Sequence, residues 1–377
     1  MILTRGARIT GAVLCAVLAA VVAGWIVRDL RAVGDVSVLL RYWAGYTDGW
    51  PKELPATLQA DPVLLVVYVL ALIAALRSSV AASTLVATGL ITLVLRLPGV
   101  WIIGSSWMDG RFDDELRTRA LIGTFVALAA GLALVVTGAA GRRQPVDSYD
   151  SHEPLPTRPG RGAGVTAFLV LGTSGAVLIA WEIRQLFTLP DSVYPAWYIG
   201  GKALTLGLTA TPPGWSSIAL GTVCLVVAWT ALLRAVHARP LGMIAAGFLL
   251  VSGACGIARV LHNGWLEDFG GAPVEQQLSM GTSFLLAFAG AAALLVLARR
   301  GLDSPDGQNE GYGGYGYPQS GAAGYGYPQA GAPGYGYPQA GAPGYGYPQT
   351  GTPPYGYPQS GGGPGSPPPP ASPPPGW

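Results

Sequence analysis

The sequence predicts an all-α, polytopic transmembrane helix bundle of about eight spans, arranged as two parallel four-helix repeats and followed by a disordered C-terminal tail. Half of the 377 residues are hydrophobic and only 11% are charged, whereas a soluble domain carries about a quarter charged residues. The apolar residues form long uncharged runs, and the last 67 residues contain no charge and no Leu, Ile, Val, Met or Phe. A net charge of +2 gives no reason to expect nucleic-acid binding.

The first apolar run covers residues 9–27 and contains nine Ile, Leu or Val residues, which is long enough for one helix to cross a bilayer. No small-x-small cleavage site follows it, so we expect an uncleaved helix. Because hydrocarbon offers backbone groups no partner, the other runs are also expected to be helices. They cover residues 62–76, 79–95, 120–140, 163–181, 215–233, 241–258 and 279–298. The second and third runs also fit one re-entrant hairpin, and seven or nine spans stay open.

The charges predict an orientation in the cell's inner (cytoplasmic) membrane. The short connections at Arg77 and at Arg234–Arg239 are basic and contain no acid, whereas fourteen of the twenty acids fall on the opposite side of the predicted bundle. Basic residues near the ends of short loops favour the cytoplasmic side. We therefore expect both termini to be cytoplasmic.

The two halves of the apolar body resemble each other. The first and fifth spans end in Trp-Ile-Val-Arg and Trp-Glu-Ile-Arg, and the third and seventh each end in arginine with a tryptophan soon after. Since each half has an even number of spans, a duplication would give parallel repeats about an axis along the membrane normal. The predicted domains are a first four-helix unit (1–141), a cytoplasmic linker (142–162), a second four-helix unit (163–300) and a cytoplasmic tail (301–377).

Charged residues gather where the predicted spans reach the outer face, and these are the candidate ligand contacts: Arg28, Asp35, Arg96, Glu182, Arg184 and Arg259. One interpretation is a vestibule in which arginines bind an anionic head group such as a phosphate while nearby indoles hold its lipid part. The alternative is that the arginines extend to the interface and the tryptophans form the interfacial belt. No span carries a charge at its centre, which disfavours a proton-coupled carrier.

The outer loop after the first span carries Asp29 and Asp35, followed by Tyr42-Trp43-Ala44-Gly45. This arrangement resembles membrane glycosyltransferases that use lipid-phosphate sugars, which place an acid in that loop before an aromatic-Ala-Gly stretch. The resemblance covers some twenty residues and implies an outer-face enzyme.

The run Gly-Thr-Ser-Gly-Ala-Val around Ser174 resembles the Gly-x-Ser-Gly-Ala motif of rhomboid intramembrane proteases. Those enzymes also need a histidine inside a later span, and neither His237 nor His262 lies in one. Ser174 is therefore interpreted as a small residue that allows close helix packing. The three histidines lie too far apart for a metal cluster, and no catalytic residue, metal or cofactor is predicted.

The tail repeats the unit Tyr-Gly-Tyr-Pro-Gln five times at a spacing of ten residues. Such a segment cannot bury enough apolar area to offset its ordering entropy, so disorder is expected. The candidate interaction residues are Tyr315, Tyr317, Tyr325, Tyr327, Tyr335, Tyr337, Tyr345, Tyr347, Tyr355 and Tyr357. The tail resembles those of many multi-pass membrane proteins of high-GC actinobacteria, which implies a lineage and not an activity.

Evenly spaced aromatic residues in an uncharged chain can make many weak contacts at once. The leading hypothesis is therefore a non-enzymatic membrane component, in contact with the lipid bilayer, that recruits cytoplasmic protein partners or self-associates through its tail. A repeat without any partner is the simpler alternative for the tail. The alternative for the whole protein is an outer-face lipid-phosphate-linked enzyme or a transporter of an anionic amphiphile.

Overall fold

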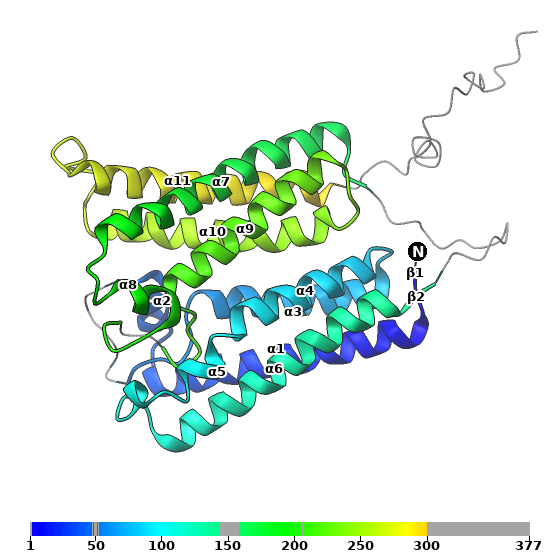
Figure 1. Cartoon of the computed structure of the whole chain (residues 1–377), viewed down its shortest axis with the longest axis horizontal. Coiled ribbons are helices and arrows are strands. Elements are labelled where there is room, and N and C mark those ends of the chain that lie inside the picture. The colour runs from blue at the N-terminus through cyan, green and yellow to red at the C-terminus, as the bar shows by residue number, and fades with distance from the viewer. Residues whose placement is uncertain are drawn as a thin grey trace, which may run out of the picture. The chain divides into compact units, whose positions relative to one another are not determined.

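The computed structural model describes residues 2–46, 48, 51, 53–143, 158–204 and 207–299. This part of the chain is mainly helical (Figure 1). Eight of its helices are long and apolar enough to cross a membrane, which confirms the predicted polytopic bundle. They are α1 (Arg5–Val33), α3 (Ala60–Arg77), α4 (Ala81–Arg96), whose span continues through the short helix α5 (Gly99–Ile102), α6 (Asp114–Ala140), α7 (Arg161–Thr188), α9 (Pro213–Leu232), α10 (Ala238–His262) and α11 (Val274–Ala298). The predicted tail and most of the predicted linker lie outside the described residues.

The short elements gather at one end of the bundle, where α1, α4, α7 and α10 finish; we call this the loop end and the opposite end the terminal end (Figure 1). The loop end holds α2 (Val36–Ala44), α5 (Gly99–Ile102), the 3₁₀ turn η1 (Ser106–Met108) and α8 (Tyr194–Ile199). At the terminal end β1 (Ile2–Leu3) pairs antiparallel with β2 (Arg142–Arg143). This pairing joins the start of the chain to the end of α6.

Most of the spanning helices extend beyond the hydrophobic runs that predicted them at one end or at both ends. Helix α1 covers residues 5–33 around the predicted 9–27, and it ends at Gly34, whose φ of 75° suits a left-handed helix cap. Helix α6 begins six residues before the predicted run, with Asp114 and Glu115 in its first turn, where acids complement the helix dipole. These extra turns carry charges, so hydropathy alone does not include them in the predicted runs.

Corresponding helices pair in the same order in the two halves. In the first half α1 packs on α3 and α4 packs on α6, and α1 also contacts α6. In the second half α7 packs on α9 and α10 packs on α11, and α7 also contacts α11. The halves meet where α10 contacts α3 and α4. A duplication would produce this arrangement, although the duplication itself stays a prediction.

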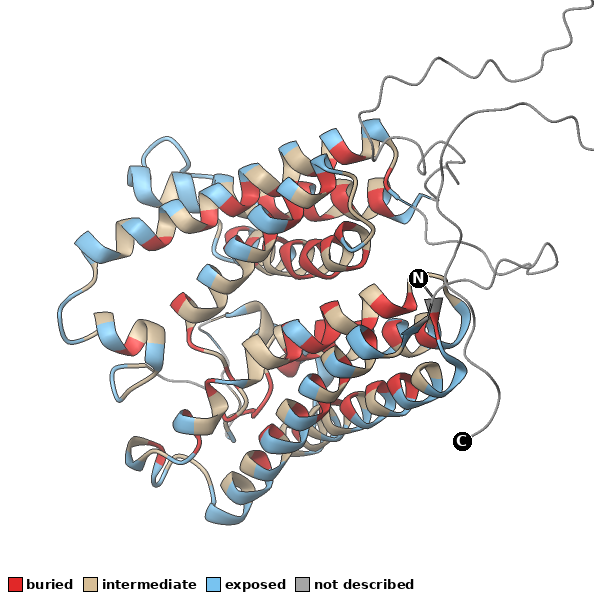
Figure 2. Ribbon diagram, turned by 45° about the vertical axis from the view of Figure 1, so that its right-hand side comes forward, coloured by how far each residue is buried: buried red, intermediate tan, exposed pale blue. Residues whose placement is uncertain are grey.

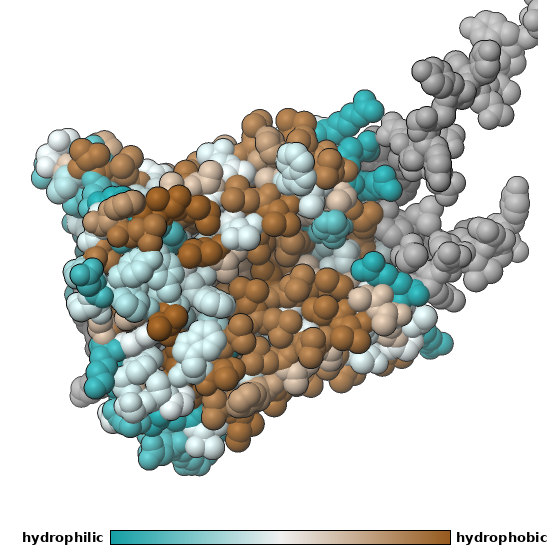
Figure 3. All heavy atoms as spheres, in the orientation of Figure 1, coloured by the Kyte–Doolittle hydropathy of each residue, from teal (hydrophilic) through white to brown (hydrophobic). Residues whose placement is uncertain are grey.

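The outer surface of the helices is apolar. Buried residues line the helix faces that pack together (Figure 2), whereas hydrophobic side chains cover the middle of the bundle (Figure 3). Among the most exposed are Phe288 (71%) and Leu295 (69%) on α11. Soluble monomers rarely expose large contiguous apolar patches, so a lipid bilayer is the environment that fits this surface.

We expect Gly175→Val to destabilise the bundle where α7 meets α9. A Cβ at Gly175 would lie 2.8 Å from the carbonyl oxygen of Gly221, and such close approach is how small residues pack membrane helices. Overpacking of this kind costs about 1–3 kcal/mol, which thermal unfolding in detergent would measure. The matched control is Gly24→Val, because a Cβ at Gly24 meets nothing within 4 Å. Equal melting temperatures for the two variants would contradict the packing described.

Candidate functional site

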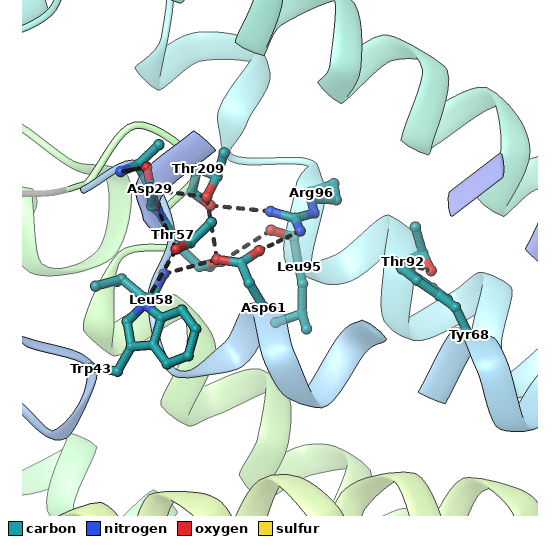
Figure 4. A network of polar contacts seen from close by, with 12 residues as sticks. Asp29, Trp43, Thr57, Leu58, Asp61, Tyr68, Thr92, Leu95, Arg96 and Thr209 are labelled. Carbon is teal, nitrogen blue, oxygen red and sulfur yellow. Dashed lines mark hydrogen bonds and ion pairs between the residues drawn. The ribbon is translucent and has the colours of Figure 1, made fainter. Parts of the chain in front are cut away.

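Asp29, near the loop end of α1, has a fully buried carboxylate that fixes the chain entering α3. Its Oδ2 accepts hydrogen bonds from the backbone N–H of Thr57 (2.7 Å) and from the Thr57 hydroxyl (2.6 Å). Its Oδ1 accepts from the backbone N–H of Ala56 (3.1 Å) and from the guanidinium of Arg28 (2.9 Å). The indole N–H of Trp43 on α2 donates to the Thr57 hydroxyl at 3.2 Å (Figure 4). One acid thus joins α1, α2 and the start of α3.

A second acid, Asp61, forms a buried ion pair with Arg96 across the loop end of α3 and α4. The guanidinium Nη2 lies 2.6 Å from Oδ1 of Asp61, and the two side chains are only 11% and 4% exposed. Asp61 stands in the first turn of α3 and Arg96 in the last turn of α4, which are the positions that helix dipoles favour for these charges. Since the two helices are antiparallel neighbours, their charged ends meet.

Thr209 connects this ion pair to the second half of the protein. Its hydroxyl donates to the carbonyl of Ala56 (2.8 Å) and lies 3.3 Å from Oδ2 of Asp61. Its own carbonyl accepts a hydrogen bond from Nη1 of Arg96 at 3.3 Å (Figure 4). Asp61 also accepts from the backbone N–H of Leu58 (2.8 Å). The network therefore holds both the entry to α3 and the segment before α9.

Further contacts fasten the α8–α9 connection, together with the first turn of α9, to the first half. The Thr211 hydroxyl donates to the carbonyl of Leu95 (3.0 Å), and the Trp215 indole N–H donates to the carbonyl of Val94 (2.8 Å). These contacts place the start of α9 against the end of α4.

Residues that follow α2 in the first half contact the end of α10 in the second half. The rings of Tyr46 and His262 stack at 4.0 Å, and the Tyr46 hydroxyl donates to the carbonyl of Ala258 on α10. Nε2 of His262 lies 2.8 Å from Oδ1 of Asp48, and this hydrogen bond lowers the pKa of that exposed acid. At the loop end, therefore, segments of each half make contacts with helices of the other half.

A cavity of about 240 Å³ lies beside the ion pair, between the two halves. Its polar lining includes Asp61, Arg96 and Ser217, whereas Leu220 and Phe248 are among its apolar lining residues. Helices α3, α4, α9 and α10 supply most of the walls. In Figure 3 the surface is hollowed between the two halves and bordered mainly by hydrophobic residues. The cavity therefore combines a charged end with an apolar body.

Of the six predicted ligand contacts, only Arg96 lines this cavity. Arg28 pairs with Asp29 and lies 3.9 Å from Glu53. Asp35 caps the N-terminus of α2, where hydrogen bonding from the backbone N–H of Ser37 lowers the pKa of its carboxyl.

The other three candidates lie in the second half, and within the described residues no hydrogen bond or ion pair joins any two of them. Glu182 is buried and accepts a hydrogen bond from the indole N–H of Trp197 at 3.0 Å. Arg184 makes a two-point ion pair with Glu275, with both N–O distances at 2.7 Å. Arg259 is exposed. The six residues therefore do not surround one pocket, and their role as ligand contacts stays a prediction.

Asp61 and Thr209 belong to the network but were not among the predicted site residues. In the sequence, Asp61 directly precedes the apolar run 62–76. The sequence did contain a signal for this ion pair, because an acid lies at the start of one short span and an arginine lies at the end of the next. Adjacent antiparallel helices bring two such ends together. Thr209 lies 148 positions from Asp61, and no local pattern marks that contact.

The structure gives no support to the motif resemblances. Ser174 is fully buried and donates to the carbonyl of Val170, and Tyr42-Trp43-Ala44-Gly45 forms the end of α2. Within the described ranges, no group of three His, Cys, Asp or Glu residues is placed to hold a metal ion. No protein-family model matches this chain, and neither does any curated protein or solved structure. Function must therefore be argued from the chain itself.

Proposed function

We propose that this integral membrane protein is a non-enzymatic membrane component that recruits partners or self-associates through its cytoplasmic repeat tail. The observation that carries the proposal is the five-fold repeat of Tyr-Gly-Tyr-Pro-Gln at ten-residue spacing. Tethering several weak binding units to one anchor raises their effective concentration, so contacts that are individually weak become strong together. The eight spans then serve as the anchor.

The contacts of the buried acids support a non-enzymatic role. Asp29 accepts hydrogen bonds from two backbone N–H groups, one hydroxyl and one guanidinium. Asp61 is held by Arg96 and by the N–H of Leu58. A general acid or base needs to exchange a proton with a substrate within hydrogen-bonding reach. Asp29 instead holds the chain before α3 in place, and Asp61, although it lines the cavity, is already engaged by Arg96 and by the N–H of Leu58.

We propose that the protein lies in the inner membrane with its terminal end facing the cytoplasm. An even number of spans puts the start of α1 and the end of α11 on the same side, and the basic turns at Arg77 and Arg234 lie there too. The positive-inside tendency favours the cytoplasm for that side. The tail, which follows α11, would then meet cytoplasmic proteins.

The alternative is an outer-face lipid-phosphate enzyme or a transporter of an anionic amphiphile. The cavity between the halves favours a binding role of this general kind. The separation of Arg28, Arg184 and Arg259 from that cavity disfavours a cluster of arginines around a phosphate.

We expect that replacing the ten repeat tyrosines by serine removes self-association or co-purification of partners. The serine variant keeps the length of the tail and its Gly, Pro and Gln residues, so it tests the tyrosine side chains alone. Multivalent binding exceeds single-unit binding by about 10²–10⁴, so we expect apparent affinity to fall by about 100-fold. Cross-linking in membranes followed by mass spectrometry measures this, with deletion of 311–377 as the limiting case.

The control is the melting temperature of the detergent-solubilised protein, which should be the same in all three forms. If partner recovery and self-association are unchanged in both the serine variant and the deletion, the proposal is wrong.

A further inference from the structure

Two hydroxyl groups that line the cavity lack an intramolecular partner. Within the described part of the chain, the side-chain hydroxyls of Ser217 on α9 and Ser252 on α10 make no hydrogen bond. Elsewhere in the spans, Thr230 and Thr282 donate to the carbonyl four residues earlier, at 2.9 and 2.8 Å, whereas the buried Thr88 hydroxyl on α4 also has no partner within the described residues. An unpaired hydroxyl is costly in an apolar environment. The two serines therefore point to a bound group that supplies their partner.

The two serines lie at different depths below the loop end. At 1.5 Å per residue, Ser217 is about 6 Å along α9 from Pro213, and Ser252 is about 15 Å along α10 from His262. Between and around them the walls are apolar, with Leu220, Val223 and Phe248 among the lining residues. A ligand that satisfies both serines carries polar atoms at its head and at its neck, and hydrocarbon beyond.

The charge of the cavity is balanced. Arg96 is paired with Asp61 at 2.6 Å, and its second terminal nitrogen donates to the Thr209 carbonyl. An anionic head group would have to displace Asp61, and a cationic one would have to displace Arg96; either exchange leaves a buried charge without its partner. A neutral head group leaves the ion pair intact and can still bond the serines.

The volume limits the size of the ligand. An apolar cavity of about 150 Å³ holds one benzene ring, and pockets for drug-sized molecules span about 300–1,000 Å³. A cavity of about 240 Å³ therefore accommodates a polar neck with part of one hydrocarbon chain, and not two chains side by side.

We propose that this cavity binds a neutral, hydroxyl-bearing amphiphile of the bilayer through Ser217 and Ser252, with one hydrocarbon chain between the two halves of the protein. The site differs from the predicted vestibule, because hydroxyls and not arginines recognise the head group.

The test uses the full chain in lipid nanodiscs and a monoacylglycerol with a photoreactive diazirine in its acyl chain. Labelled peptides are mapped by mass spectrometry. We expect labels on α9 and α10 near Val223 and Phe248, and competition by unlabelled monoacylglycerol. The fatty acid and the alkyltrimethylammonium with the same chain should compete at least tenfold less well.

Two variants and a matched control connect the label to the cavity. Removing both hydroxyls by Ser217→Ala with Ser252→Ala should lower labelling, by about fivefold for each hydrogen bond lost. Leu220→Trp should fill the cavity and abolish labelling at both sites. Leu225→Trp lies on the same helix but on its exposed side, and it should change nothing.

The proposal is overturned if the serine variant labels as well as the wild type, or if the labels fall on the exposed face of α9. If the fatty acid competes as well as monoacylglycerol or better, the conclusion that the head group is neutral is wrong. If Leu220→Trp does not fold, the serine variant, which makes no change in bulk, still decides the outcome.

Discussion

Replacing Asp29 by alanine should lower the free energy of unfolding by about 3–5 kcal/mol, because it leaves the buried donors of Ala56 and Thr57 without an acceptor. The carboxylate is fully buried and accepts four hydrogen bonds. Without it, the N–H groups of Ala56 and Thr57 lose their acceptor in a place that water does not reach. For a domain of this size the melting temperature should fall by about 10 °C, as measured by thermal unfolding in detergent.

The matched control is Asp35→Ala, which removes the same type of side chain at the N-cap of α2. Asp35 is exposed and its carboxylate caps α2 through the N–H of Ser37, so water can replace the lost contact. We expect only a small change in melting temperature for this variant. Similar losses for the two variants would show that burial of Asp29 does not stabilise the loop end.

Breaking the ion pair between Asp61 and Arg96 should have an effect of the same size. Removing one partner of a buried pair costs about 3–5 kcal/mol, because the other charge stays buried alone. We therefore expect Asp61→Ala and Arg96→Ala each to lower the melting temperature strongly. The double variant should lose clearly less than the sum of the two, since it leaves no uncompensated charge.

The α8–α9 connection provides a second measurement for these variants. Because Thr209 bonds to both Asp61 and Arg96, losing either partner should speed proteolysis of residues 199–211 in the detergent-solubilised protein. The control pair is Glu115 and Arg119, an exposed contact four residues apart on α6, where the expected loss is about 0–1 kcal/mol. Additive effects of Asp61→Ala and Arg96→Ala would show that the two charges do not depend on each other.

The fold could be predicted from the sequence because its main determinant is local. A run of about twenty apolar residues requires a spanning helix wherever it occurs. Even the shortest run, 62–76, forms a helix, Ala60–Arg77, with Asp61 in its first turn. The helix ends were harder to predict, because turns such as Asp114–Arg119 of α6 are polar, and the acids in this first turn favour a helix through its dipole rather than through hydropathy.

The site was predictable only in part. Arg96 was a candidate because an arginine ends a span, and it does line the cavity. Its partners come from other parts of the chain: Asp61 is 35 positions away and the carbonyl of Thr209 is 113 positions away. Such contacts depend on which helices are neighbours. Arg184 also lies near the end of a predicted span, but it pairs with Glu275 and does not line the cavity. Helix ends alone do not reveal which charges meet.

Site-specific labelling of single cysteines tests the eight-span bundle most directly. In a background with Cys15, Cys224 and Cys255 replaced by alanine, single cysteines are placed at Asp191 and Gly270 of the loop end and at Arg158 and His237 of the terminal end. A membrane-impermeant maleimide added to intact spheroplasts should label positions 191 and 270 only, and inverted vesicles should show the opposite pattern. Labelling of both ends of α7 or of α10 from the same side would contradict a membrane-spanning bundle.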